Sequence, residues 1–340
     1  MGVGEAALRP WAGAGALIVA VLLSAVLIVL LRPWLIRYAL ARPNARSSHR
    51  EPTPQGGGIA VVGATILVTI GAVWLASAEG SAEISVVLAA AAFIAVVGGV
   101  DDVRPLPVVP RLVLQMLAAF AAIAVMPADM RIAPVPWWAE RLCLLLALLW
   151  FINLTNFMDG IDWITVAEMV PVTASLVLLG AYAKLPQPAM ILALALLGAM
   201  LGFAPFNKPV AKLFLGDVGS LPIGLLVGWM LLRLAQAGEA AAAVLLPLYY
   251  LADASVTLAR RAAAGEPFWQ AHRSHFYQRA GDMGFTVPEI VGRVLLTNVA
   301  LALLALLTVA WHQPWVIAIA LLAGAALVAW LLASFTRKRR

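Results

Sequence analysis

The sequence predicts an all-α polytopic membrane protein with about eleven transmembrane helices. Of its 340 residues, 63% are hydrophobic and only 12% are charged, and the mean hydropathy is +0.96. A soluble domain carries about a quarter charged residues, so this composition excludes an ordinary soluble enzyme, a disordered chain and a disulfide-rich secreted scaffold. Apolar runs of a length that crosses a bilayer as a helix recur along the whole chain.

The apolar runs place the expected spans at residues 11–31, 57–76, 84–100, 111–127, 139–155, 163–183, 188–204, 218–234, 240–258, 289–310 and 314–335. The first run ends at Arg32 and Pro33 without a cleavage pattern, so we interpret it as a retained span rather than a signal peptide. We expect one integral membrane domain over residues 1–340. Its polar motifs lie between about 46 and 280, and two further spans occupy 289–335.

The basic residues predict the orientation of these spans. Loops 32–56, 101–110, 156–162, 205–217 and 259–288 and the tail 336–340 share one side of the membrane. All 23 Lys and Arg residues lie on or beside that side except Arg9, Arg131, Arg141, Lys184 and Arg233. The positive-inside rule therefore places these loops and the C-terminus in the cytoplasm and the N-terminus outside. Topology also accounts for the net charge of +6 without a nucleic-acid partner.

The aspartates cluster on the same side, where all eight lie except Asp129. Carboxylates contribute little to topology, so their position indicates chemistry at the inner surface. Asp101 and Asp102 end the third span, in the string GGVDDVRP. In such a pair, one carboxylate can serve as a base while the other faces a metal ion. A solvated helix cap is the alternative interpretation.

Two further strings carry polar residues beside apolar runs. In NLTNFMDGIDW a spacing of three separates Asn153, Asn156, Asp159 and Asp162. In a helix this spacing places them along one face, which suits a polar cavity for a metal ion or a hydroxyl-rich ligand. The alternative is a helix–loop boundary rich in turn formers.

The string FNKPVAKLFLGDVGS holds Asp217 between two glycines, just before the eighth span. A carboxylate there suits a hard cation, and the N–H groups that begin the next helix suit an anion. The polar residues Asn207, Lys208 and Lys212 precede it and add positive charge where a phosphate would lie. An ordinary interfacial loop is the alternative.

The two remaining strings are basic. In FWQAHRSHFYQR the side chains of His272, Arg273 and His275 favour phosphate or sugar recognition over zinc, because no cysteine or acidic set accompanies them. A basic segment attracted to anionic lipid is the alternative. In RSSHREPTPQGGG, His49 precedes three glycines, which allow either a close phosphate or tight helix packing.

In this order the five strings resemble the polyprenyl-phosphate N-acetylhexosamine-1-phosphate transferases. This superfamily, glycosyltransferase family 4, includes the MraY translocase and the WecA-like initiators of glycan synthesis. The histidine loop is HRSH rather than a run of histidines, and an eleventh span is expected. Both features are more similar to the WecA-like branch that initiates O-antigen chains.

The resemblance implies transfer of a sugar-1-phosphate from a UDP-sugar to undecaprenyl phosphate, which yields undecaprenyl-diphosphate-sugar and UMP. The implied cofactor is Mg²⁺, with Mn²⁺ as a substitute. The implied donor is UDP-N-acetylglucosamine or a 6-deoxy derivative, and the product would begin O-antigen, lipopolysaccharide or another cell-envelope glycan. The implied location is the bacterial inner membrane, with the active site facing the cytoplasm. A homodimer is a candidate assembly.

The resemblance also implies roles for individual residues. Asp217 would be the main metal ligand and Asn156 a second, while Asp101 and Asp102 would approach the lipid phosphate. Binding of the substrates would fall to His49, Asn153, Asp159, Asp162, Asn207, Lys208, His272, Arg273 and His275. Trp163 departs from the family pattern, because a glycine usually follows the final aspartate of this motif, and a tryptophan there would tighten the nucleotide pocket.

The competing hypothesis is a transporter of an anionic or lipid-linked substrate. Glu168, inside the sixth span, favours it, since ionisable residues within a membrane often mark a substrate path. However, the sequence shows no paired repeats of the kind that transporters carry, and its carboxylates lie at one face.

Overall fold

The computed structural model describes residues 10–41, 52–76, 80–129, 131–182, 185–266 and 273–338. Its helices are α1 (Pro10–Tyr38), α2 (Gly58–Ala76), α3 (Ser81–Val103), α4 (Val108–Ala124), α5 (Trp137–Met158), α6 (Ile164–Tyr182), α7 (Gln187–Asn207), α8 (Asp217–Gln236), α9 (Ala240–Leu245), α10 (Leu248–Ala263), α11 (Phe276–Asp282), α12 (Val287–Ala310) and α13 (Pro314–Phe335). Two short strands, β1 (Leu40–Ala41) and β2 (Thr53–Pro54), pair antiparallel.

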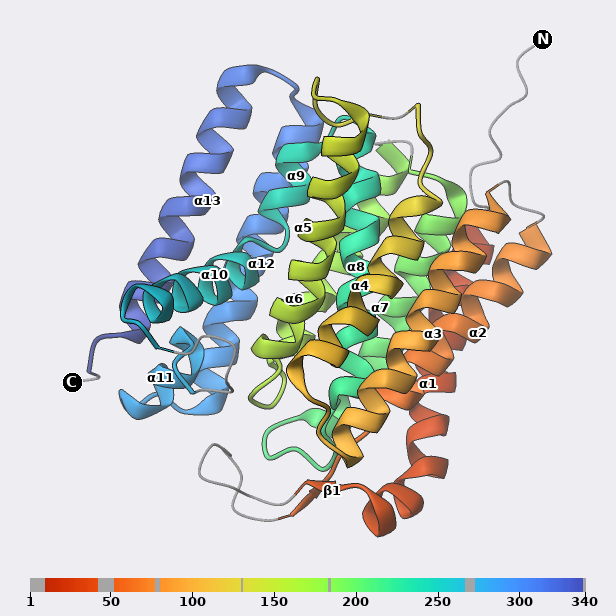
Figure 1. The fold of residues 1–340 in the computed structure, drawn as a ribbon, viewed down its shortest axis with the longest axis vertical. Helices are drawn as coiled ribbons and strands as arrows, with labels where there is room; N and C mark the ends of the chain where they lie inside the picture. The colour runs from red at the N-terminus through yellow and green to blue at the C-terminus, as the bar shows by residue number, and fades with distance from the viewer. Residues whose placement is uncertain are drawn as a thin grey trace.

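The long helices stand side by side as one bundle (Figure 1). Within the described residues, eight helices are long and apolar enough to cross a membrane: α1, α2, α3, α5, α7, α8, α12 and α13. Helices α4 and α6 are shorter apolar helices of the same bundle. The all-α, multi-pass prediction is thus confirmed, whereas the count of eleven spans is not.

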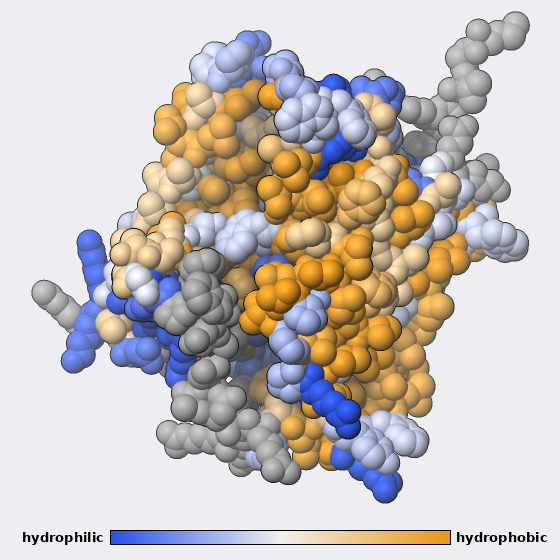
Figure 2. Space-filling view, viewed as in Figure 1, coloured by the Kyte–Doolittle hydropathy of each residue, from blue (hydrophilic) through white to orange (hydrophobic). Residues whose placement is uncertain are grey.

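Helix α8 forms the centre of the bundle. Nearly all of its residues are buried, and α2, α3 and α5 pack against it. The outer helices instead expose large apolar side chains, such as Leu30 on α1 and Leu322 on α13. Figure 2 shows a broad hydrophobic belt across the middle of the molecule, with hydrophilic residues gathered toward its ends. An apolar surface of this kind suits contact with lipid. The helices also satisfy their own backbone hydrogen bonds, as the interior of a membrane requires.

The expected span 240–258 is wrong as a single helix. The chain forms α9, turns at Leu246 and Pro247, and continues as α10, which lies across the bundle in Figure 1. Proline lacks the N–H group that a continuous helix needs. In addition, the carboxyl group of Glu168 lies close to the backbone N–H of Tyr250 in the first turn of α10. Glu168 is fully buried and also accepts a bond from Asn298 of α12 at 2.6 Å, so it joins three helices.

Glycines let α2 approach α8 closely. A Cβ atom on Gly58 would lie 2.2 Å from Cα of Gly219, and a Cβ atom on Gly98 of α3 would lie 2.3 Å from the carbonyl oxygen of Asp217. Of the two hypotheses for the glycine triplet, the structure therefore supports tight helix packing. This packing brings the ends of α2, α3 and α8 together.

We expect Gly58→Ala to destabilise the protein. The added methyl group overlaps backbone atoms of Gly219, which cannot rotate away, and overpacking of this kind costs about 1–3 kcal/mol. Thermal unfolding of the purified protein in detergent measures the loss. Gly71→Ala is the matched control in the same helix, because a Cβ atom there meets nothing within 4 Å. Equal unfolding temperatures for the two variants would contradict the packing argument.

Candidate active site

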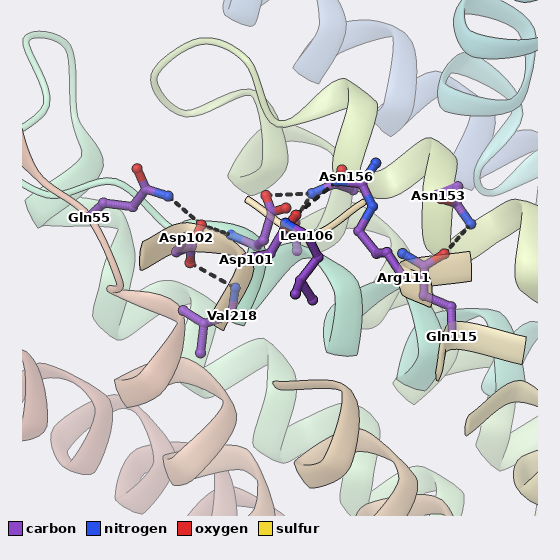
Figure 3. Close-up of polar contacts among 11 residues, drawn as sticks. Gln55, Asp101, Asp102, Leu106, Arg111, Gln115, Asn153, Asn156 and Val218 are labelled. Carbon is purple, nitrogen blue, oxygen red and sulfur yellow. Dashed lines mark hydrogen bonds and ion pairs between the residues drawn. The ribbon is translucent and has the colours of Figure 1, made fainter. Parts of the chain in front are cut away.

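Three segments distant in sequence meet at one end of the bundle. The residues before α2 run beside the residues before α8, with a parallel bridge between Gln55 and Phe214. The backbone N–H of Gly57 donates to the carbonyl oxygen of Phe214, and that of Gly58 to the carbonyl oxygen of Leu215, both at 2.8 Å. The end of α3, with its two aspartates, lies against this pair of segments (Figure 3).

Asp102 caps the start of α8. Its carboxylate accepts hydrogen bonds from the backbone N–H of Asp217 at 2.9 Å and of Val218 at 3.1 Å, and the side chain of Gln55 donates a third (Figure 3). A negative charge suits the unpaired N–H groups at a helix N-terminus. Gly216 leaves the room for this contact: its φ is 78°, and a Cβ atom there would lie 2.6 Å from Asp102.

Asp101 points toward a different set of groups. It forms an ion pair of 2.8 Å with Arg111 of α4 and accepts the backbone N–H of Leu106 at 2.5 Å. Its carboxyl group also lies in hydrogen-bonding contact with that of Asp217. Asn156 of α5 completes the group, because its amide donates to Asp217 at 2.7 Å and to Ser220 at 3.0 Å.

The structure thus brings together Asp101, Asn156 and Asp217, three of the residues that the motifs singled out. Two adjacent carboxyl groups repel each other when both are ionised, so they must share a proton or a cation. Asp102 faces the backbone instead. Among the described residues, no group of three or more His, Cys, Asp or Glu side chains is placed to hold a metal ion. An ion such as Mg²⁺ needs fewer protein side chains, because one or two carboxylates bind it together with water and substrate phosphates.

Asp159 ends α5 beside this group. It accepts a hydrogen bond from the hydroxyl of Thr165 at 2.5 Å, and the hydroxyl of Tyr250 donates to Thr165 at 3.3 Å. Burial raises the pKa of Asp159 to about 7, and the nearby charges of Asp102 and Asp162 act in the same direction. Burial likewise raises the pKa of Tyr277 well above its usual value.

The raised pKa of Asp159 predicts a pH-dependent stability. In the unfolded chain this carboxyl ionises near pH 3.8, whereas in the folded protein it resists ionisation up to about pH 7. The folded state therefore loses stability as the pH rises through this window. Asp159→Asn removes the loss, so the unfolding temperature of the variant should rise relative to the parent between pH 5 and pH 8. A constant difference across that range would contradict the assignment.

The other predicted residues of the two central motifs mainly join segments. Asn153 is buried and donates to Gln115 of α4 at 2.7 Å. The carboxylate of Asp162 accepts the backbone N–H of Ala211 at 2.9 Å. Asn207 donates to the carbonyl oxygen of Leu213 at 2.9 Å. The first contact joins α5 to α4, and the other two fix the loop that precedes α8. Lys208, in that loop, is exposed.

Trp163 has a backbone conformation that favours glycine. Its φ is 64°, the one positive value among the described non-glycine residues. Glycine adopts such a conformation most readily, in agreement with the glycine that the resemblance implies here. Two hydrogen bonds hold the tryptophan there. Its backbone N–H donates to the side chain of Asn207 at 2.8 Å, and its indole N–H donates to the carbonyl oxygen of Ala204 at 2.6 Å.

The basic loop divides into two parts. His275 is buried, its ring stacks between Phe157 and Tyr277, and its Nδ1 atom lies 3.3 Å from Asp253. Arg273 instead pairs with Asp282 at 3.8 Å. The predicted residues His49 and His272 lie outside the described residues.

Two residues of the site were not predicted. Gln55 lies in the string PTPQGGG, but its partner Asp102 is visible only once the loops are folded together. Asp253 is fully buried in α10 and accepts the backbone N–H groups of Phe276 at 3.0 Å and Tyr277 at 3.1 Å. A carboxylate inside the expected span 240–258 was a signal for it, since ionisable residues in apolar runs are costly.

Comparison with known proteins identifies the central part of the chain. Residues 84–235 match the family model described as Glycosyl transferase family 4. This region belongs to glycosyl transferase family 4. The resemblance predicted from the motifs is thereby confirmed. The family region contains the end of α3, α5 and α8, and with them Asp101, Asp102, Asn156 and Asp217.

Several named enzymes are similar to this chain. Decaprenyl-phosphate N-acetylglucosaminephosphotransferase of Mycobacterium tuberculosis is 32% identical over 215 residues, which are 56% of this chain and 52% of the relative. Phospho-N-acetylmuramoyl-pentapeptide-transferase of Leuconostoc mesenteroides is 25% identical over 245 residues (63% and 72%). A probable undecaprenyl-phosphate N-acetylglucosaminyl 1-phosphate transferase of Bacillus subtilis is 23% identical over 287 residues (79% and 78%). The chain spans about half the length of the mycobacterial relatives that it matches.

Proposed function

We propose that this protein transfers a sugar-1-phosphate from a UDP-N-acetylhexosamine to undecaprenyl phosphate, releasing UMP. The observation that carries the proposal is the meeting of Asp101, Asn156 and Asp217 at one end of a membrane-spanning bundle. The three lie within the region that matches the family. The names of three relatives support the same chemistry. Two are named as transferases of N-acetylglucosamine phosphate that act on a polyprenyl phosphate, and the third as a phospho-N-acetylmuramoyl-pentapeptide-transferase.

The donor groups fit a magnesium ion. Asp217 and Asp101 supply adjacent carboxylate oxygens, and the side-chain amide of Asn156 lies against Asp217. Hard oxygen ligands of this kind suit Mg²⁺, and Mn²⁺ is a candidate substitute. When bound, such an ion screens the charge of the diphosphate and stabilises the departing UMP. Arg111, paired with Asp101, contributes a further positive charge beside the group.

The acceptor substrate, a lipid phosphate, needs little help from a general base. The second pKa of a phosphate monoester is about 6, so the lipid phosphate is largely ionised at neutral pH. The difficulty is to bring two anions together, which positioning and positive charge solve. We therefore assign to Asp102 a positioning role, since its carboxylate holds the backbone that carries Asp217. Asp101 is the carboxylate of the pair that faces the substrates.

The finer features of the proposal rest on the charge pattern and motifs. The clustered basic loops orient the site toward the cytoplasm, with the N-terminus outside the bacterial inner membrane. The exposed Lys208 provides positive charge near the site for an anionic substrate. The HRSH loop favours a WecA-like enzyme that initiates O-antigen, lipopolysaccharide or a related glycan.

An assay of purified protein tests the proposal. The protein is incubated with undecaprenyl phosphate, Mg²⁺ and one member of a panel of UDP-sugars, and released UMP and lipid-linked sugar are measured. We expect both products with one UDP-N-acetylhexosamine, including the 6-deoxy derivatives. A transporter would release no UMP. Absence of UMP across the panel, from protein that unfolds cooperatively, would overturn the proposed function.

A further inference from the structure

A charged pocket, separate from the candidate active site, lies between α10 and α11. It has a volume of about 410 Å³ and is lined by Arg260 and Arg261 from the last turn of α10 and by Arg273 and Arg279 from the next segment. Two acidic residues, Glu266 and Asp282, also line it. Four guanidinium groups therefore face two carboxylates.

The positive charge of this pocket is only partly neutralised. Arg261 pairs with Glu266 at 2.7 Å, and Arg273 pairs with Asp282 at 3.8 Å. Arg260 instead lies over the ring of Phe276, 5.4 Å from its centroid. Within the described residues, no ion pair to a carboxylate is seen for Arg260 or Arg279. Two positive charges in one concave surface attract an anion, and guanidinium groups match phosphate oxygens in particular.

The walls of the pocket are held in place. The buried carboxylate of Asp253 on α10 accepts the first two backbone N–H groups of α11, those of Phe276 and Tyr277. Phe276, which supports Arg260, is itself buried. The two helices that carry Arg260 and Arg279 are therefore held together, which favours binding because little backbone freedom remains to be lost.

The pocket and the candidate active site lie on different faces of α11. Tyr277 donates from its hydroxyl to the carbonyl oxygen of Phe157, at the end of α5. Arg279 follows two residues later, and two helical positions differ by about 200° around the helix axis. The pocket on the Arg279 side is thus separated from Asp159 and Asp217 by α11 itself.

The surroundings of the pocket are those of a membrane surface. Helix α11 packs against α13, and Arg337 and Lys338, which follow α13, lie beside the exposed Trp330. Basic residues next to an exposed tryptophan are typical of the boundary between lipid and water. Figure 2 shows strongly hydrophilic residues around α10, α11 and the end of α13, directly beside the hydrophobic belt.

We propose that the pocket binds a phosphate ester, and that the ester is the headgroup of an anionic phospholipid. Arg260 and Arg279 hold the phosphate oxygens, while Arg261 and Arg273 keep their carboxylate partners. The site is separate from the one that handles the sugar donor, and it anchors α10 and α11 to the membrane surface.

Lipid titration of the full-length protein tests this site. The purified protein in a neutral detergent is titrated with short-chain phosphatidylglycerol, and binding is followed by the rise in unfolding temperature. We expect Arg260→Gln combined with Arg279→Gln to weaken binding by about tenfold or more, because charged hydrogen bonds are lost. The matched control, Arg32→Gln with Arg37→Gln, removes two exposed charges from α1 and should leave the affinity within about twofold, because these charges lie outside the pocket.

A second titration with UDP distinguishes the two sources of phosphate. UDP binding should be the same in the parent and in the Arg260/Arg279 variant. Loss of UDP binding with lipid binding intact would overturn the lipid assignment. Equal lipid binding by the pocket variant, the control variant and the parent would overturn the site altogether. Since neither titration requires turnover, their outcomes are independent of the proposed transfer reaction.

Discussion

Replacing Asp217 with alanine should abolish the proposed transfer while the protein still inserts and folds. Asp217 stands on the first turn of α8, where Asp101 and Asn156 both contact it. Loss of its carboxylate removes the central oxygen ligand for a cation and leaves two approaching anions unscreened. Preorganised electrostatic groups of this kind contribute about two to three orders of magnitude to the rate. Release of UMP by purified variant and parent, at matched protein concentration, measures the effect.

Asp129→Ala is the control for this substitution, because Asp129 is exposed and lies outside the site. It should retain full activity. The unfolding temperature of the Asp217 variant should respond less to added Mg²⁺ than that of the parent, which gives a second measurement without turnover. Near-normal turnover by Asp217→Ala would refute the assignment of the site.

Replacing Asp102 with asparagine should lower the rate by at least about tenfold without changing the shape of the pH profile. An amide has one acceptor oxygen, whereas Asp102 accepts from two backbone N–H groups of α8 and from Gln55. An unsatisfied N–H group in a buried position costs about 1–3 kcal/mol, and the displaced helix start carries Asp217 out of position. The maximal rate and the Michaelis constants, measured between pH 5.5 and pH 9, report this effect.

The pH profile separates a positioning residue from a general base. A base would give a rate that falls at low pH in the parent, and the variant would lose that limb. Gln55→Leu provides an independent check, because it removes one of the same hydrogen bonds without touching a carboxylate. If Asp102 and Gln55 act together, the double variant should lose less than the sum of the two single losses. Additive losses, or a missing acidic limb in the Asp102 variant, would show that this role is wrong.

Much of the fold follows from composition and spacing alone. The apolar runs predicted each of the eight long helices to within several residues, since a bilayer fixes both the length and the apolarity of a span. The break at Pro247 was missed because the run 240–258, which covers α9 and most of α10, is as long as one span. Only tertiary contacts, such as that between Glu168 and Tyr250, distinguish the two cases.

The site could be predicted in part. Carboxylates and amides beside apolar runs identified Asp101, Asn156 and Asp217, because polar groups at such positions need a partner. The direction in which each side chain points could not be predicted. Asp101 and Asp102 are adjacent in sequence, yet one turns toward Arg111 and the other toward the backbone of α8. Residues such as Asn153 and Asn207 fit the same pattern but join helices and loops. Polarity alone therefore does not separate residues of the candidate site from residues with a structural role.

The capping of α8 by Asp102 has a consequence for biosynthesis. This contact joins residues that are 115 positions apart, and the contact of Asn156 with Asp217 joins residues 61 apart. A nascent chain of which only α1 to α7 have entered the membrane therefore carries Asp101 and Asp102 at the end of α3. It still lacks the backbone N–H groups of α8 that later donate to Asp102. The insertion of α8 satisfies Asp102 and brings Asp217 beside Asp101 and Asn156 in a single step, so chains truncated before α8 should be recognised as unfinished by membrane proteases.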